Sequence, residues 1–219
     1  MVSYSKVVLV LFCVGLELIS SGCRKKKQTH LVEKLLTKES AQITEARDAL
    51  LAARKTEELT AQLINLIAEK KNRNEYIGGV EAAMFVLGEM RAVEAVPVLV
   101  EHIGYPHYCE PGEGPAGGYP GFSSGMLVRR VSEYVRIFPG VEALTKIGEH
   151  CLDDVVTGLA GAKSMVQAKP YLVVLVVLRE RDSAVEILKE AMDKETEVNR
   201  RNRLQKCVDW LKQLKQDDI

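Results

Sequence analysis

The residues of this chain that could bind a metal ion or transfer a proton are a few histidines, two of which stand beside a carboxylate. His102 follows Glu101, and His150 follows Glu149. Imidazole and carboxylate groups are common metal ligands and common general acids or bases. Together with His107, these histidines leave open one alternative, a metal-dependent enzyme. The sequence has no Ser-centred nucleophile elbow and no phosphate-binding loop, so we expect no catalytic residues, no metal site and no cofactor.

The five cysteines offer little further chemistry of this kind. Cys109, Cys151 and Cys207 are far apart and lack a CxxC spacing, which argues against a zinc site or a thioredoxin-type motif. Cys151 and Cys207 fall within helical patterns, so we expect them to be small buried side chains. Cys23 differs from the others because of the residues that precede it.

An apolar run from Val7 to Ile19 leads to Cys23 through the small residues Ser20, Ser21 and Gly22. A basic residue, an apolar run and small residues, in that order, are typical of an export signal. The run is shorter than the roughly 20 residues that a membrane-spanning helix needs. The segment resembles a bacterial lipoprotein signal, with Ser20 where a lipobox usually has Leu. The resemblance implies that residues 1–22 are a signal peptide and that the Cys23 thiol carries a diacylglyceryl group.

Basic side chains follow Cys23 at once, at Arg24, Lys25, Lys26 and Lys27. Each would add about 1 kcal/mol of attraction to an anionic membrane surface, while two or more acyl chains anchor a protein stably. We therefore expect residues 23–38 to be a lipidated, basic tether and the protein to be lipid-anchored in a bacterial cell envelope. An uncleaved N-terminal helix is the alternative.

The composition predicts one folded domain after the tether, residues 39–219. The chain has 219 residues, of which 47% are hydrophobic, and a formal net charge of zero. These values fit a packed core and give no global basic field that would attract nucleic acid. A local basic patch is interpreted as the solvated face of a helix; it consists of Arg200, Arg201, Arg203 and Lys206.

Two helix-pair patterns in this domain align without a gap. Leu87-Gly88-Glu89 matches Ile147-Gly148-Glu149, and the apolar residues around both recur at the spacing of amphipathic helices. Weaker copies occur at 46–67 and 178–188. The pattern resembles HEAT repeats, especially their short bacterial form. The resemblance implies an all-α fold, an α-solenoid of about four HEAT-like helix pairs. Gly88 and Gly148 are expected to allow close helix packing or to end a helix.

Proline and capping residues predict where individual helices begin or bend. Pro139 should kink a long helical stretch at 126–150, and Pro170 should kink or start a helix. Ser183 and Glu186 form a capping box, which should open the helix that follows it.

Two further segments need tertiary context to be assigned. Residues 172–178 are rich in β-branched side chains, yet the spacing of their leucines favours a helix that is buried nearly all round. From Thr196 onward, an apolar stripe opposite charged residues predicts a closing helix, the C-terminal cap of the array.

A segment rich in glycine and proline, residues 104–125, interrupts the helical pattern. Structureless loops longer than about 12–15 residues inside a compact array are usually functional or disordered, and aromatic side chains supply large contact areas in interfaces. We expect a partner-binding loop; the alternative is a tolerated insertion whose aromatic side chains fold back on the helices. The predicted contact residues are Tyr105, His107, Tyr108, Tyr119 and Phe122.

These features together predict a scaffold rather than an enzyme. Stacked helix pairs form extended surfaces that suit contact with another protein. The sequence therefore favours a membrane-tethered scaffold or adaptor that binds an envelope protein, with no catalysis. The alternatives are a metal-dependent enzyme that uses His102, His107 and His150, or a carrier of a lipid or small ligand in a groove between helices.

Overall fold

The computed structural model describes residues 28–105 and 131–214, and these form only helices and the loops between them. In this part of the chain 83% of the residues are helical and none lies in a strand. The all-α prediction is therefore confirmed. None of the helices described there is long and apolar enough to cross a membrane.

The helices follow one another closely along the chain, after a helical segment at 28–34. Within residues 28–105 they are α2 (Ser40–Leu51), α3 (Glu57–Ala68), α4 (Lys70–Glu75), α5 (Ile77–Glu89), the 3-10 helix η1 (Val93–Ala95) and α6 (Val96–Glu101). Within residues 131–214 they are α7 (Val131–Ile137), α8 (Pro139–Ile147), the 3-10 helix η2 (Glu149–Cys151), α9 (Leu152–Gly161), α10 (Met165–Lys194) and α11 (Val198–Gln213).

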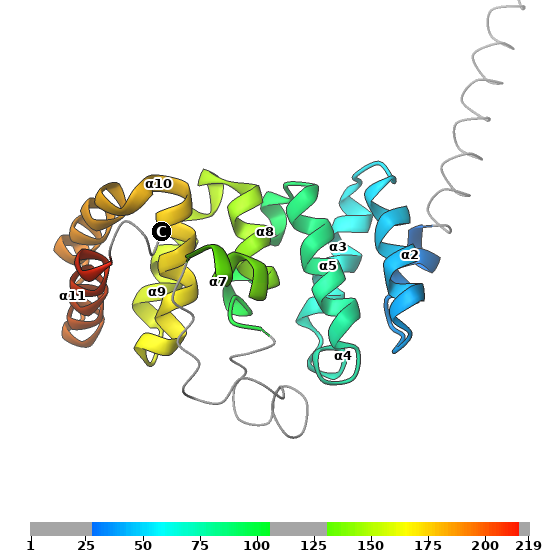
Figure 1. Ribbon diagram of the computed structural model, residues 1–219, viewed down its shortest axis with the longest axis horizontal. Coiled ribbons are helices and arrows are strands. Elements are labelled where there is room, and N and C mark those ends of the chain that lie inside the picture. The colour runs from blue at the N-terminus through cyan, green and yellow to red at the C-terminus, as the bar shows by residue number, and fades with distance from the viewer. Residues whose placement is uncertain (1–27, 106–130, 215–219) are drawn as a thin grey trace, which may run out of the picture.

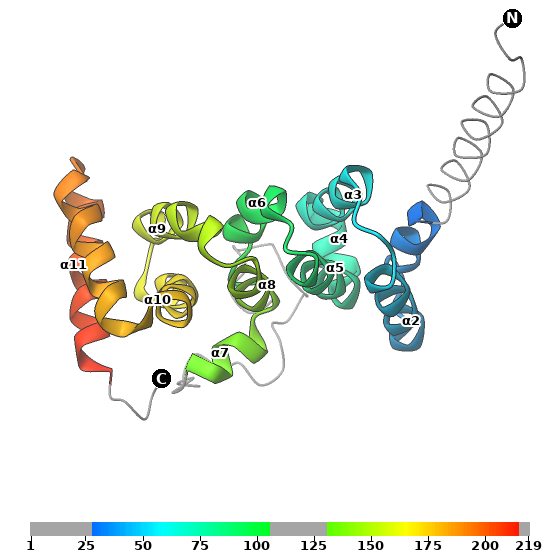
Figure 2. The same ribbon diagram turned by 90° about the horizontal axis from the view of Figure 1, so that it is seen from above.

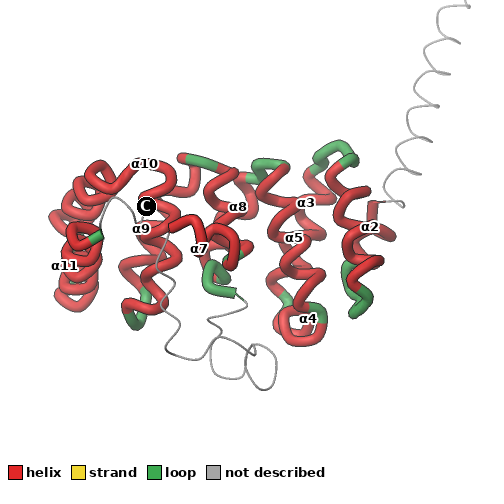
Figure 3. The backbone as a smooth tube through the Cα atoms, in the orientation of Figure 1, coloured by secondary structure: helices red, strands yellow, loops and turns green. Residues whose placement is uncertain are grey.

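Most of these helices lie side by side in two rows (Figure 2). One row holds α2, α5, α8 and the first part of α10, and the other holds α3, α6 and α9. The loops lie at the ends of the helices (Figure 3), so the helix sides can pack against one another. The last helix, α11, packs against α10 and α9, at the opposite end of the array from residues 28–34 (Figure 1).

An apolar core fills the space between the rows, and it includes fully buried leucines such as Leu63, Leu87 and Leu144. Helices α5 and α8 approach closely because Gly88 has no side chain: a Cβ atom built on Gly88 would lie 2.6 Å from the Cα atom of Ala143. Gly148 ends α8 with a φ of 85°, a conformation that favours glycine. Both roles expected of the two glycines are thus confirmed.

Pro139 separates two helices and does not bend a single one. Helix α7 ends at Ile137 and α8 begins at Pro139, with Phe138 in an extended conformation between them. At the first position of a helix the missing N–H of proline costs nothing. The described part of the stretch at 126–150 is therefore two successive helices, where the sequence predicted one kinked helix.

The boundaries predicted within α10 are wrong in two places. The helix begins at Met165, where the Ser164 side chain accepts a hydrogen bond from the backbone N–H of Gln167, and it continues through Pro170. The interruption comes at Glu180, with φ 61° and ψ 164°. The chain has therefore turned before Ser183, which lies inside the second part of α10 and does not open it. A non-glycine residue rarely adopts this conformation, so the local sequence gave no signal for the turn.

The assignments of the β-branched segment and of the closing helix are confirmed. Residues 172–178 lie within α10, and those from Leu172 to Val176 are buried. Helix α11 begins at Val198, close to the predicted start at Thr196. Its apolar face contributes buried side chains to the core, namely Leu204, Cys207, Val208 and Leu211.

The folded part of the chain begins earlier than the predicted boundary at residue 39. Val32 and Leu35 belong to the core, and a Cβ atom built on Gly79 of α5 would overlap the carbonyl oxygen of Leu35. The segment from residue 28 to Leu35 therefore packs with the domain. The rest of the predicted tether, from Cys23 to Lys27, and the predicted signal peptide at 1–22 lie outside the described residues.

Candidate functional site

Of the five predicted contact residues in the glycine-rich segment, only Tyr105 lies within the described residues. Its side chain is 3% exposed, and its hydroxyl donates a 2.8 Å hydrogen bond to the carbonyl oxygen of Arg73. Tyr105 thus packs in the core and offers almost no surface to a partner. The other four, His107, Tyr108, Tyr119 and Phe122, lie outside the described residues, as does the rest of the segment up to residue 125.

Arg73, whose backbone carbonyl accepts the hydrogen bond from Tyr105, was not singled out from the sequence. Its side chain is 5% exposed, and its guanidinium donates hydrogen bonds of 2.8 and 2.5 Å to the carbonyl oxygens of Ile67 and Ala68. These carbonyls end α3, where a cation also interacts favourably with the helix dipole. Arg73 therefore caps α3 with its side chain and holds Tyr105 through its backbone carbonyl, and both roles are structural.

The histidines proposed as alternative metal ligands lie on different elements. His102 is the C-cap residue of α6, and His150 lies in η2. His107 lies outside the described residues. In residues 28–105 and 131–214 there is no group of three or more His, Cys, Asp or Glu side chains that could hold a metal ion.

The two described cysteines, Cys151 and Cys207, are buried, as expected, and no disulfide joins them. The Cys151 thiol donates to the carbonyl oxygen of Leu144 over 3.6 Å, and Cys207 lies 4.0 Å from the sulfur of Met165. Burial raises the pKa of both thiols to about 11. A neutral thiol is a poor nucleophile, so neither side chain suits catalysis at neutral pH.

The raised thiol pKa values predict a loss of stability in alkali. An unfolded thiol loses its proton above its ordinary pKa of 9.0, whereas the folded thiol keeps it until about pH 11. The free energy of unfolding should therefore fall as pH rises through this window, by up to about 1.4 kcal/mol per pH unit for each thiol. Urea unfolding at a series of pH values measures this slope. The double variant Cys151→Ala, Cys207→Ala should show a shallower slope, and an unchanged slope would contradict the assignment.

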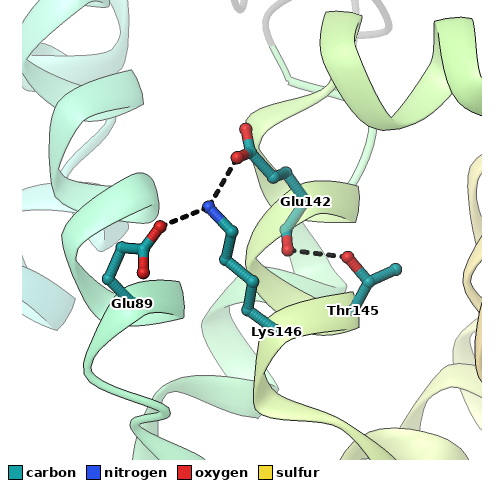
Figure 4. Close-up of polar contacts among 4 residues, drawn as sticks. All are labelled: Glu89, Glu142, Thr145 and Lys146. Atoms are coloured by element: carbon teal, nitrogen blue, oxygen red, sulfur yellow. Dashed lines mark hydrogen bonds and ion pairs between the residues drawn. The ribbon is translucent and has the colours of Figure 1, made fainter.

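A half-buried aromatic ring on α5, Phe85, lies between two cations. The Lys146 ammonium lies 4.2 Å and the Arg47 guanidinium 5.5 Å from the ring centre, within the range of cation–π attraction. Lys146 also donates 2.6 Å hydrogen bonds to Glu89 and Glu142 (Figure 4). Burial alone would lower the pKa of Lys146, but these hydrogen bonds raise it above its ordinary value. The cluster joins α5 to α8 through paired charges and is a packing contact.

Two adjoining cavities lie where α11 meets α9 and α10. The first, of about 350 Å³, lies between α9, the second part of α10 and α11. The second, of about 590 Å³, lies between the end of α9, the start of α10 and the start of α11. Ala160 and Arg200 border both. The first cavity mixes apolar residues such as Val156 and Leu204 with carboxylates such as Asp153 and Glu190.

The second cavity, here called the basic cavity, is the candidate functional site. Four cationic side chains line it, together with a single carboxylate, that of Glu197; the cations are Lys163, Arg200, Arg203 and Lys206. The sequence showed three of these residues as a patch on one helix. Lys163 lies far from them along the chain and joins them only because α11 packs beside the loop between α9 and α10. No local sequence pattern could have shown the cavity.

No family model matches the sequence, and no curated protein sequence matches it. The class that the structure defines is therefore an all-α protein with an array of packed helices and a cationic cavity near its C-terminal end.

Proposed function

We propose that the helix pairs are HEAT-like repeats that stack into an α-solenoid, with α11 as its C-terminal cap. A recurring contact supports this proposal. Glu89 and Glu149 hold the same position in the two clear sequence copies. Glu89 pairs with Lys146 on α8 at 2.6 Å, and Glu149 pairs with Arg179 on α10 at 3.0 Å. Each carboxylate thus pairs with a cation on the next helix of the same row, as expected of a repeating unit.

We infer that this array is a scaffold or adaptor that binds another envelope protein and carries out no reaction. The observation that carries the proposal is the arrangement in rows (Figure 2), because helices placed side by side present a long lateral surface. Such surfaces suit contact with a protein partner. Apart from Tyr105, which is buried, the proposed contact residues are His107, Tyr108, Tyr119 and Phe122.

The scaffold is proposed to be held at a membrane by its N-terminal segment. In this proposal the Cys23 thiol carries a diacylglyceryl group, and the side chains from Arg24 to Lys27 lie against anionic headgroups. The helical segment at 28–34 lies at the α2 end of the array (Figure 1). In this proposal the opposite end, which holds α11, would be farthest from the anchor. Cys23→Ser should abolish acylation, detected by mass spectrometry, whereas Cys109→Ser should leave it intact.

Partner capture from crosslinked membranes tests the scaffold role. The intact chain is compared with one in which residues 107–124 are replaced by a short Gly/Ser linker; Tyr105 is kept because it packs in the core. We expect an envelope protein to be retained by the intact chain and lost by the shortened one, with the binding reproduced between the two purified proteins. Equal capture by both would place the contact on the helix rows.

Circular dichroism and thermal unfolding provide the control for this experiment, because the shortened chain must keep the helical content of the intact one. If both chains are folded, both reach the membrane and neither retains a partner, the scaffold proposal is contradicted.

A further inference from the structure

We propose that the basic cavity binds a small anion that carries phosphate groups. Its cations come from two parts of the chain: Lys163 precedes α10, whereas Arg200, Arg203 and Lys206 lie on α11. The cavity volume of about 590 Å³ lies within the range of small-molecule sites, about 300–1,000 Å³. This site does not depend on the membrane tether or on the scaffold role.

Charge is the first argument for an anionic ligand. The three cations on α11 follow one another at three-residue intervals on one face of the helix, where like charges repel. Glu197 neutralises only part of this positive charge, through an ion pair of 3.1 Å with Arg200. Among the described residues, no carboxylate lies within ion-pair distance of Arg203 or Lys206. A bound anion would supply the missing countercharge at the place where the cations converge.

Geometry is the second argument. The Arg203 guanidinium donates one hydrogen bond, of 3.2 Å, to the carbonyl oxygen of Ala160 at the end of α9. This contact fixes the planar group at the cavity wall and leaves further N–H donors in a fork that matches phosphate oxygens. The side chains of Ser164, Asn199 and Asn202 add neutral hydrogen-bonding groups to the lining.

The same chemistry identifies the class of ligand. A polar lining with few apolar residues suits a hydrophilic anion, and several cations in one cavity favour an anion with more than one negative charge. Phosphate groups with these properties occur in free small anions and in lipid headgroups. Pyrophosphate represents the first source and glycerol 3-phosphate, the polar part of a phosphatidic acid, represents the second.

Isothermal titration of the full-length chain with each of these two compounds, in a buffer without phosphate, tests the proposal. The main variant is Lys206→Gln, since the Lys206 side chain has no partner within the described residues whose loss could unfold the protein. The matched control is Lys212→Gln, which removes the same charge from an exposed position of the same helix but outside the cavity. Arg203→Gln is the second variant.

We expect Lys206→Gln and Arg203→Gln each to weaken binding by about tenfold, the value of a charged hydrogen bond, and Lys212→Gln to leave it unchanged. Binding of pyrophosphate alone would indicate a free anion, and binding of glycerol 3-phosphate alone would indicate a headgroup; either supports the site. The proposal is overturned if neither compound binds, or if Lys212→Gln weakens binding as much as Lys206→Gln, since the attraction would then be a general property of the helix charge.

Discussion

Replacing Phe138 with alanine should lower the free energy of unfolding by about 3–5 kcal/mol, the range found for large aromatic side chains removed from a core. Phe138 lies between α7 and α8 and is 0% exposed. Its ring stacks on Tyr134 with the centroids 5.3 Å apart. The substitution would leave a cavity that the two helices cannot close without moving. Urea denaturation monitored by circular dichroism measures the change.

Phe85→Ala provides the matched control, because it removes the same atoms from a ring that is only half-buried. Phe85 is half-buried on α5 beneath Lys146 and Arg47, so water can reach the space that its ring leaves. We expect a clearly smaller loss of stability than for Phe138→Ala. Equal losses would mean that α7 does not pack on α8 as described.

The second large effect is expected at the contact between α5 and α8. Gly88→Ala should cost about 1–3 kcal/mol, as overpacking does elsewhere, although alanine is the better helix former. The added methyl would lie 2.6 Å from the Cα atom of Ala143, which is backbone and cannot rotate away. The two helices would have to separate along their shared face. Thermal and urea unfolding both report this loss.

Gly161→Ala is the control for Gly88→Ala, because it makes the same chemical change near the end of another helix. A Cβ atom built on Gly161 meets no other atom within 4 Å. This substitution should raise stability by about 0.4–1 kcal/mol through the entropy of the unfolded chain. The test is therefore whether Gly88→Ala lowers the free energy of unfolding while Gly161→Ala raises it. A stabilising Gly88→Ala would contradict the close approach of α5 and α8.

The sequence predicted the helical class because apolar spacing is a local property. The segment at 172–178 shows how far this reasoning reaches: its side chains favour a strand, but the leucine spacing correctly predicted a buried helix. Close helix packing or a helix end was predicted for Gly88 and Gly148 together, and the structure assigns the first role to Gly88 and the second to Gly148.

Tertiary contacts explain what the sequence could not show. The capping pattern at Ser183 is a valid local signal, yet the chain turns earlier, at Glu180. From the sequence, Arg73 would be taken for an ordinary surface cation. The structure shows it buried, because its guanidinium caps the carbonyl groups at the end of α3. Lys163 joins the basic residues of α11 through the fold alone, so the basic cavity has no linear motif.

The placement of α11 at the opposite end of the array from the helical segment at 28–34 (Figure 1) has a mechanical consequence. If a membrane holds one end and a bound molecule pulls on the other, the load passes through successive helix contacts, from α2 through α5 and α8 to α10 in one row and from α3 through α6 to α9 in the other. The two rows then share the force at each step along the array, and the total extension is the sum of small openings between neighbouring helices.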